Sequence, residues 1–193
     1  MGVAELEQAM KFTFVHIPRT GGNSLGKYLE GMFHSTGRLG HRHPRLNKIK
    51  NPQPPVITIV RNPWEWHVSW YHTLRGKNDV GLGELQDICR KFGFPTYIRC
   101  LNSMDYSNAI QYCYPCWQLS DWLQGHIDDI LRTETLDEDV NKLLSKYGIS
   151  RQITPMKISD SGHGPYQRYY TDRTKDIVAR RHKDDIKRFG YEF

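Results

Sequence analysis

Two short apolar runs, each followed by a helical pattern, stand out in the first third of the chain. Residues 11–17 (KFTFVHI) are typical of a strand, and residues 56–60 (VITIV) are a continuous apolar, β-branched run of the kind buried in a parallel sheet. After the first run, apolar side chains follow the three- and four-residue spacing of a helix face: Leu25, Tyr28, Leu29, Met32 and Phe33. This order predicts a strand, a loop and a helix in succession.

A second helix is predicted directly after the second run. Asn62 is expected to be its N-cap and Pro63 its first helical residue, opening WEWHVSWYHTL. Two strand-to-helix units about 40 residues apart are typical of α/β proteins. We therefore predict an α/β fold, a single domain with a central parallel sheet flanked by helices, and a ligand at the carboxyl ends of the strands.

The second half of the chain is predicted to be mostly helical. A short strand over residues 128–134 leads into a helix that a capping box of Thr135 and Glu138 opens and that ends before Gly148. A final basic helix is predicted over residues 172–189.

Residues 150–170, rich in Ser, Gly, Pro and Tyr, indicate a long loop. The sequence contains no repeat, low-complexity tract or linker that would divide it. Residues 11–193 are therefore expected to form one domain, preceded by a disordered N-terminal segment over residues 1–10.

The composition adds a preference for anionic partners. Of the 193 residues, 38% are hydrophobic and 25% are charged, which suits one globular core. The net charge of +6 favours a nucleotide, a sulfated or phosphorylated sugar, a nucleic acid or a membrane surface. The charge alone does not choose among these partners.

The N-terminal residues MGVAELEQAM lack the apolar core of a secretory signal, and no apolar run is long enough to span a membrane. The expected compartment is therefore the cytoplasm, where thiols stay reduced. The four cysteines are Cys89, Cys100, Cys113 and Cys116. Only the last two are closely spaced, so the pattern favours reduced, partly buried thiols over a structural zinc site or a redox CxxC pair. No metal site is predicted.

The loop between the first strand and the first helix carries candidate binding chemistry. Gly21 and Gly22 allow the backbone to approach a ligand closely, and amide groups at the start of the helix point at an anion. Arg19 adds a fixed charge with several donors. Neutral donors follow at Thr20, Asn23 and Ser24. The loop therefore predicts a site for a terminal phosphate, although a capped turn without a ligand is the alternative.

A second phosphate contact is predicted at the end of the second strand. Arg61 leaves this strand and Ser69 lies two helical turns further on, so that both could reach a phosphate beside the first. The alternative is that Arg61 satisfies a helix terminus or a surface carboxylate.

Together, HIPRTGGNSL and VRNPWEWHVSWY resemble the two signatures of sulfotransferases that use 3′-phosphoadenosine 5′-phosphosulfate (PAPS). The first resembles the 5′-phosphosulfate loop, commonly HIPKTGGTSL, and the second the 3′-phosphate motif, commonly VRNPxxRxxSxY. QLSDWLQGHIDDILRTETLDEDVNKLLSKYGI and YQRYYTDRTKDIVARRHKDDIKRFGYEF are similar to later segments of the family. The resemblance covers most of residues 11–193 and points to the carbohydrate branch, which is related to the glycosaminoglycan sulfotransferases.

The resemblance implies a P-loop NTPase-like sulfotransferase fold and an enzyme. Its expected reaction moves a sulfuryl group from PAPS to a hydroxyl or amine of an acceptor, a carbohydrate or a small molecule, and leaves adenosine 3′,5′-bisphosphate. No metal is required. The residues that the resemblance places at the cofactor are Arg19, Thr20, Gly21, Gly22, Asn23 and Ser24 at the 5′ end, and Arg61, Ser69, Tyr166 and Arg168 at the 3′-phosphate. A basic, solvated loop is the alternative for the last two.

Two residues depart from the family pattern. Arg19 stands where lysine is usual, so the charge that neutralises the leaving phosphate is kept while proton donation is lost. Trp66 stands where the 3′-phosphate motif usually has a second arginine, and it is expected to be a core residue.

The segment GRLGHRHPRL supplies the candidate general base. Neutral imidazole accepts a proton near neutral pH, which makes His41, with His43 in reserve, suitable for deprotonating the acceptor. The family carries its catalytic histidine in a similar GHxP-like segment. A solvated loop histidine without this role is the alternative, and His16 is interpreted as a residue that orients the loop.

Two other function classes stay open. A nucleotide kinase or another NTPase-like phosphate-binding protein would need the GxxxxGK[ST] lysine and a magnesium ligand, which the sequence does not place. A basic nucleic-acid-binding module would show a DNA- or RNA-binding motif, and none is visible. Neither nucleic acid nor a membrane span is therefore expected.

Overall fold

The computed structural model describes residues 11–36, 43–76, 82–103, 113–150 and 162–193. Contacts divide the chain into two compact units, each built from two separate stretches. The sheet unit comprises Met1–Arg61 and Ser120–Ser159, and the helical unit comprises Asn62–Leu119 and Asp160–Phe193. The expectation of one domain over residues 11–193 stays a prediction.

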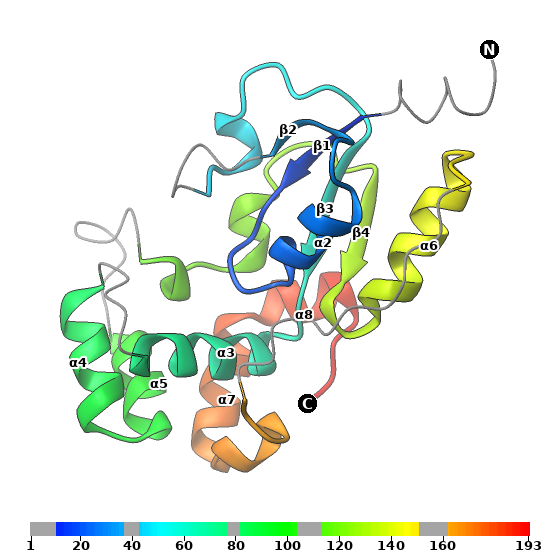
Figure 1. Ribbon diagram of the computed structural model, residues 1–193. Helices are drawn as coiled ribbons and strands as arrows, with labels where there is room; N and C mark the ends of the chain where they lie inside the picture. The colour runs from blue at the N-terminus through cyan, green and yellow to red at the C-terminus, as the bar shows by residue number, and fades with distance from the viewer. Residues whose placement is uncertain (1–10, 37–42, 77–81, 104–112, 151–161) are drawn as a thin grey trace. The chain divides into compact units, whose positions relative to one another are not determined.

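The sheet unit contains four parallel strands in the order β2-β1-β3-β4 (Figure 1). Their bounds are Phe12–Val15 for β1, Phe33–Thr36 for β2, Val56–Val60 for β3 and Asp129–Arg132 for β4. The three predicted strands are confirmed, and so is the α/β class. Because all four strands run in the same direction, their carboxyl ends meet at one edge of the sheet.

Strand β2 was not predicted. The first helix, α2, spans only Gly22–Tyr28, and the backbone then turns at Gly31, whose φ of +82° suits glycine. The amide of Phe12 donates to the carbonyl of Met32 at 2.8 Å, which returns the chain to the sheet. Placing Phe33 on the helix face was therefore wrong, since Phe33 begins β2 and its ring stacks on Phe14.

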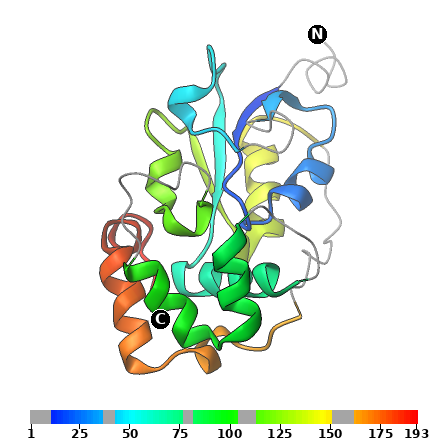
Figure 2. The same ribbon diagram turned by 90° about the vertical axis from the view of Figure 1, so that its left-hand side faces the viewer.

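The core of the sheet unit lies between the sheet and two helices, α2 and α6 (Leu136–Lys146). Figure 2 shows α2 and α6 on one side of the sheet and the short 3-10 turn η1 (Leu46–Lys48) on the other. The buried side chains of this core are Phe12, Phe14, Leu25, Tyr28, Leu29, Met32, Ile57, Ile59, Leu131, Leu136, Val140, Leu143, Leu144 and Ile149. The two helices are also joined by a hydrogen bond from the Tyr28 hydroxyl to Asp137.

The two ends of α6 differ in how well the sequence predicted them. The Thr135 side chain makes no capping bond to the helix backbone and donates to Asp139 at 3.0 Å, so the predicted capping box is wrong. At the other end Gly148 has a φ of +68°, and the amide of Ile149 donates to the carbonyl of Leu144. These bonds form the glycine-dependent helix ending that was predicted.

The described residues of the helical unit are mainly α-helical. The bounds of these helices are Pro63–Arg75 for α3, Gly83–Lys91 for α4, Phe94–Ser103 for α5, Asp172–Arg181 for α7 and Lys183–Phe189 for α8. This unit also contains the 3-10 turns Tyr114–Cys116 (η2) and Tyr166–Tyr169 (η5), while a further turn, Leu119–Trp122 (η3), starts at Leu119 and continues into the stretch of the sheet unit. The Asn62 side chain accepts the amide of Trp64 at 3.0 Å, which confirms the predicted N-cap of α3.

The predicted final helix is broken at His182, which ends α7 and begins α8. Its ring is fully buried, with Nδ1 3.0 Å from Asp185 Oδ2 and Nε2 2.9 Å from His67 Nε2. His67 Nδ1 in turn lies 3.3 Å from the Tyr97 hydroxyl. Burial, followed by the nearby charges of His182 and Arg181, holds the pKa of His67 well below its usual value. A local sequence pattern could not reveal this break, because the bonds at His182 join distant helices.

Most of the aromatic residues in the middle of the chain are core. Trp66 is fully buried among His67, Trp70 and His182, as expected for a residue that replaces a phosphate-binding arginine. Other tryptophans and one tyrosine of this region are also buried: Trp64, Trp70, Tyr71 and Trp122. Trp117 is half-buried.

Among the helices that the structure describes, none combines the length and the apolar character needed to cross a membrane.

Candidate anion-binding site

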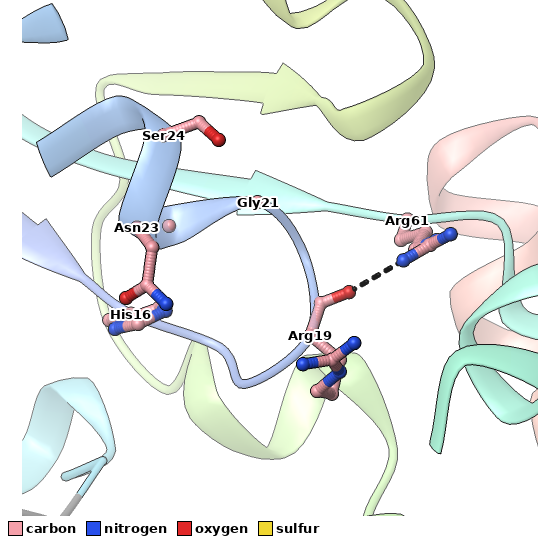
Figure 3. A pocket seen from close by; sticks show the side chains of 7 residues that line it. His16, Arg19, Gly21, Asn23, Ser24 and Arg61 are labelled. Carbon is pink, nitrogen blue, oxygen red and sulfur yellow. Dashed lines mark hydrogen bonds between the residues drawn. The ribbon is translucent and has the colours of Figure 1, made fainter. Parts of the chain in front are cut away.

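A pocket opens where β1 and β3 end in the sheet unit (Figure 3). The pocket is small, since the centres of water-sized molecules can occupy about 40 Å³ of it. Its lining residues are His16, Arg19, Gly21, Gly22, Asn23, Ser24 and Arg61. The structure thus brings together both arginines and most of the loop residues that the sequence predicted.

The backbone of the loop takes conformations that expose it to the pocket. Arg19 has a φ of +67° and Gly21 a φ of +90°, both in the left-handed region. Helix α2 begins at the next residue, Gly22. A Cβ atom on Gly22 would lie 2.2 Å from the His16 ring, so the ring can pack against the backbone only because this residue is glycine. The second glycine of the loop is therefore required by a close approach.

Two threonines hold the loop from inside the unit. The buried Thr20 hydroxyl donates to the carbonyl of Ile17 at 2.8 Å, and Thr20 does not line the pocket with its side chain. The Thr133 hydroxyl lies 2.7 Å from the carbonyl oxygen of Thr20 and 3.1 Å from that of Val60. Thr133 thereby ties the residue after β4 to the loop after β1 and to the end of β3.

The electrostatics of the pocket favour an anion. Arg61 donates to the carbonyl oxygen of Arg19 at 3.1 Å, which Figure 3 marks with a dashed line. Burial first, and the charge of Arg61 second, lower the pKa of the Arg19 guanidinium. None of the described residues that line the pocket is acidic. A bound anion would offset the repulsion between the two guanidinium groups and give their donors a charged acceptor.

His16, which lines this pocket, contacts a second histidine, His43. The His16 ring, 7% exposed, stacks on Phe14 with ring centroids 5.2 Å apart. His43 packs edge-on against His16 at 4.5 Å, and its Nδ1 lies 3.2 Å from the His16 carbonyl oxygen. A carbonyl can only accept, so Nδ1 of His43 is the donor and, in the neutral ring, Nε2 carries the lone pair. That tautomer is the one a general base at Nε2 requires.

The remaining predicted residues are in other parts of the chain. His41 lies outside the described residues. Ser69 is fully buried in α3, Tyr166 is half-buried in η5 with its hydroxyl 3.4 Å from Asn62 Nδ2, and Arg168 is exposed. Ser69, Tyr166 and Arg168 belong to the helical unit, and their assignment to a 3′-phosphate stays a prediction.

Thr133 was not among the predicted site residues, and His16 was predicted only to orient the loop. Thr133 follows directly after β4, and polar residues just beyond the carboxyl ends of parallel strands often reach a ligand site. His16 directly precedes the glycine loop and lines the pocket itself. Among the ranges that the structure describes, no group of three or more His, Cys, Asp or Glu side chains could hold a metal ion.

Comparison with protein-family models finds no match to this chain, and comparison with curated proteins finds none either.

Proposed function

We propose that this protein is a PAPS-dependent sulfotransferase of the P-loop NTPase-like fold. The observation that carries the proposal is the pocket in which Arg19 and Arg61 meet a glycine loop at the carboxyl ends of two parallel strands. The residues there are those of the two sequence signatures, HIPRTGGNSL and VRN. A pocket that gathers two guanidinium groups and no acidic lining side chain suits a ligand with more than one anionic group.

The donor set fits the 5′ end of PAPS. Arg19, Asn23 and Ser24 offer a charge, an amide and a hydroxyl, and Gly21 and Gly22 leave the backbone open to the ligand. When bound, PAPS supplies the sulfuryl group, whose bond to the 5′-phosphate oxygen breaks as a bond to the acceptor oxygen or nitrogen forms. Arg19 neutralises the charge that develops on the departing phosphate, as cationic side chains do in phosphoryl transfer.

Arg61 is the residue that we assign to the 3′-phosphate. Its guanidinium is oriented by the bond to the Arg19 carbonyl and lines the same pocket as the glycine loop. We assign Ser69, Tyr166 and Arg168 to the same phosphate on the resemblance alone.

The acceptor must lose a proton during transfer. We assign the removal of this proton to a histidine of residues 40–43 (GHRH). His43 has the tautomer that leaves Nε2 able to accept a proton, because Nδ1 donates to the His16 carbonyl. His41 is the other candidate for this step. The acceptor itself is a hydroxyl or an amine, and we propose a carbohydrate or a small molecule.

Thermal melts with different nucleotides test the proposal. Adenosine 3′,5′-bisphosphate is expected to stabilise the protein without magnesium and more strongly than ATP or AMP, because two phosphate sites are occupied at once. A ligand present at a hundred times its Kd stabilises by about 2.7 kcal/mol. Equal shifts from ATP and the bisphosphate, or a strict magnesium requirement, would favour a kinase or another NTPase.

A transfer assay then tests the reaction. Labelled PAPS is incubated with a panel of glycans, lipids, phenols and small alcohols, and label in the acceptor is measured. The protein could instead bind the bisphosphate tightly but neither transfer label to any acceptor nor slowly hydrolyse PAPS. That result would indicate a binding protein and would contradict the proposed enzymatic activity.

A further inference from the structure

Cys113 and Cys116 form a pair of neighbouring thiols in the helical unit. The amide of Cys116 donates to the carbonyl of Cys113 at 2.8 Å, which closes the turn η2, and the two sulfur atoms lie 2.7 Å apart. Both residues are thiols in the structure, and both are buried. They belong to neither half of the proposed phosphate site.

The backbone of this turn already suits a disulfide. A turn closed by such a bond keeps its first and fourth Cα atoms within about 7 Å, and disulfides need a separation of about 4.4–6.8 Å. Since the sulfur atoms are already in contact, a bond between them requires a movement of less than about 1 Å. Oxidation is therefore possible without rebuilding the helical unit.

The two thiols are not equivalent. Cys113 is 6% exposed and Cys116 is 1% exposed, so an oxidant reaches Cys113 first. The hydrogen bond from the Cys116 thiol lowers the pKa of Cys113, while donating that bond raises the pKa of Cys116. Because the thiolate is the attacking form, both properties make Cys113 the nucleophile and Cys116 the resolving thiol.

Arg181 holds the turn in place. Its guanidinium donates to the carbonyl of Cys116 at 2.5 Å and to that of Leu101 at 3.1 Å, which joins η2 to the end of α5. Burial lowers its pKa to about 10, so the side chain is still charged at neutral pH. The geometry of the Cys113–Cys116 turn is thus fixed by the hydrogen bonds of the partly buried Arg181 guanidinium as well as by the contact between the two sulfur atoms.

We propose that Cys113 and Cys116 are a redox-active pair that a low-molecular-weight disulfide, such as glutathione disulfide, converts to an intramolecular disulfide. The Cys113 thiolate attacks one sulfur of the oxidant and releases one glutathione thiolate. The Cys116 thiol then loses its proton and attacks the Cys113 sulfur, which releases the second glutathione. Two electrons pass from the protein thiols to the oxidant, and excess reduced glutathione reverses both steps.

The test is oxidation of the folded, full-length chain by glutathione disulfide, followed by intact mass and peptide mapping. The expected product has lost about two mass units, carries no glutathione and links Cys113 to Cys116. Excess reduced glutathione is expected to restore the original mass. A stable glutathione adduct, or a chain that stays reduced under these conditions, would contradict the proposal.

The other two cysteines provide a matched control. Cys89 is fully buried, and burial, followed by the nearby Cys100, raises its pKa to about 12, so Cys89 is not expected to react quickly. The double variant Cys89→Ser/Cys100→Ser is expected to form the disulfide at the wild-type rate, whereas Cys113→Ser and Cys116→Ser are expected to form none. A Cys89–Cys100 disulfide in the wild-type protein would overturn the assignment.

Differential alkylation of the wild-type protein needs no variant and serves if a serine variant fails to fold. Iodoacetamide is added before and after oxidation, and labelled peptides are quantified. Loss of label from Cys113 and Cys116 together is expected. Loss from Cys113 alone would mean that it forms only mixed disulfides.

Discussion

The hydroxyl of Thr133 lies 2.7 Å from the carbonyl oxygen of Thr20, although the two residues are 113 positions apart in the chain. This contact fixes the glycine loop after β1 from the neighbouring end of β4.

Replacing Thr133 with valine is expected to lower the free energy of unfolding by about 1 kcal/mol, since a buried hydrogen bond is lost. The affinity for adenosine 3′,5′-bisphosphate should fall as well, because the loop loses an anchor. Urea unfolding and calorimetry measure the two effects. Thr135→Val is the control, since Thr135 is exposed and bonds only to Asp139 in the same helix. Equal effects from both variants would contradict a special part for Thr133.

Gly22→Ala is expected to abolish bisphosphate binding and to destabilise the protein, because the new Cβ would lie 2.2 Å from the His16 ring. Gly26→Ala is the matched control on the same helix. A Cβ there meets no atom within 4 Å, so alanine is expected to stabilise the protein by about 0.5–1 kcal/mol through helix propensity. Thermal melts with and without the bisphosphate compare the two. Unchanged ligand binding in Gly22→Ala would mean that the loop does not hold the phosphate.

Arg61→Ala is expected to weaken bisphosphate binding by one to two decades, which corresponds to about 1.5–3 kcal/mol for a charged contact. The affinity of Arg61→Lys should lie between those of the wild type and Arg61→Ala, because lysine keeps the charge but lacks the planar guanidinium group. Titration calorimetry measures each affinity. Arg99→Ala, a change at an arginine on α5 whose hydrogen bond to Thr96 is exposed, should leave affinity unchanged. A wild-type affinity for Arg61→Ala would place the 3′-phosphate elsewhere.

His43→Ala, or His41→Ala if that residue is the base, is expected to reduce turnover by about 10²–10⁴ and to leave bisphosphate affinity nearly intact. Turnover is measured as transfer to an acceptor or as slow hydrolysis of PAPS. His126→Ala is the control, since its ring is exposed and bonds to Asp128. If both variants keep full turnover, a carboxylate such as Glu65 or Glu134 becomes the candidate base.

Stability is expected to fall as the pH drops below about 6.5, the ordinary pKa of histidine. The pKa of His67 is far lower in the folded chain, so the unfolded chain binds the extra proton and the free energy of unfolding decreases. The slope approaches about 1.4 kcal/mol per pH unit for one such proton. Urea unfolding between pH 7 and pH 5 measures it, and His67→Gln should flatten the profile. If the free energy of unfolding of His67→Gln depends on pH as in the wild type, another titratable group must cause the loss of stability.

The gathering of the glycine loop and Arg61 in one pocket could be predicted because their signals are local. A glycine pair after an apolar run and an arginine at the end of a second run define two strand ends, and parallel strands place those ends together. The N-cap at Asn62 and the end of α6 at Gly148 could be predicted because their signals are also local.

The features that the sequence did not reveal depend on which of several possible contacts form, some of them between distant residues. Strand β2 is four residues long and continues a helical apolar spacing across Gly31, so its pairing with β1 decides its structure. The break at His182 depends on buried bonds to His67 and Asp185. Thr135 and Thr171 are both helix N-caps, but only Thr171 forms a capping box, with Thr174. At Thr135 the nearby Asp139 competes for the hydroxyl.

The interleaving of the two units limits how the protein can be dissected. A fragment that stops at Arg61 would lack β4 and would leave unpaired the edge of β3 that faces β4, and an open edge of this kind promotes aggregation. In terms of chain order, residues 62–119 are an insertion between β3 and the stretch that carries β4. Truncation is therefore a poor route to a minimal version of the sheet unit, whereas excising that insertion and rejoining its flanks keeps every strand of the sheet.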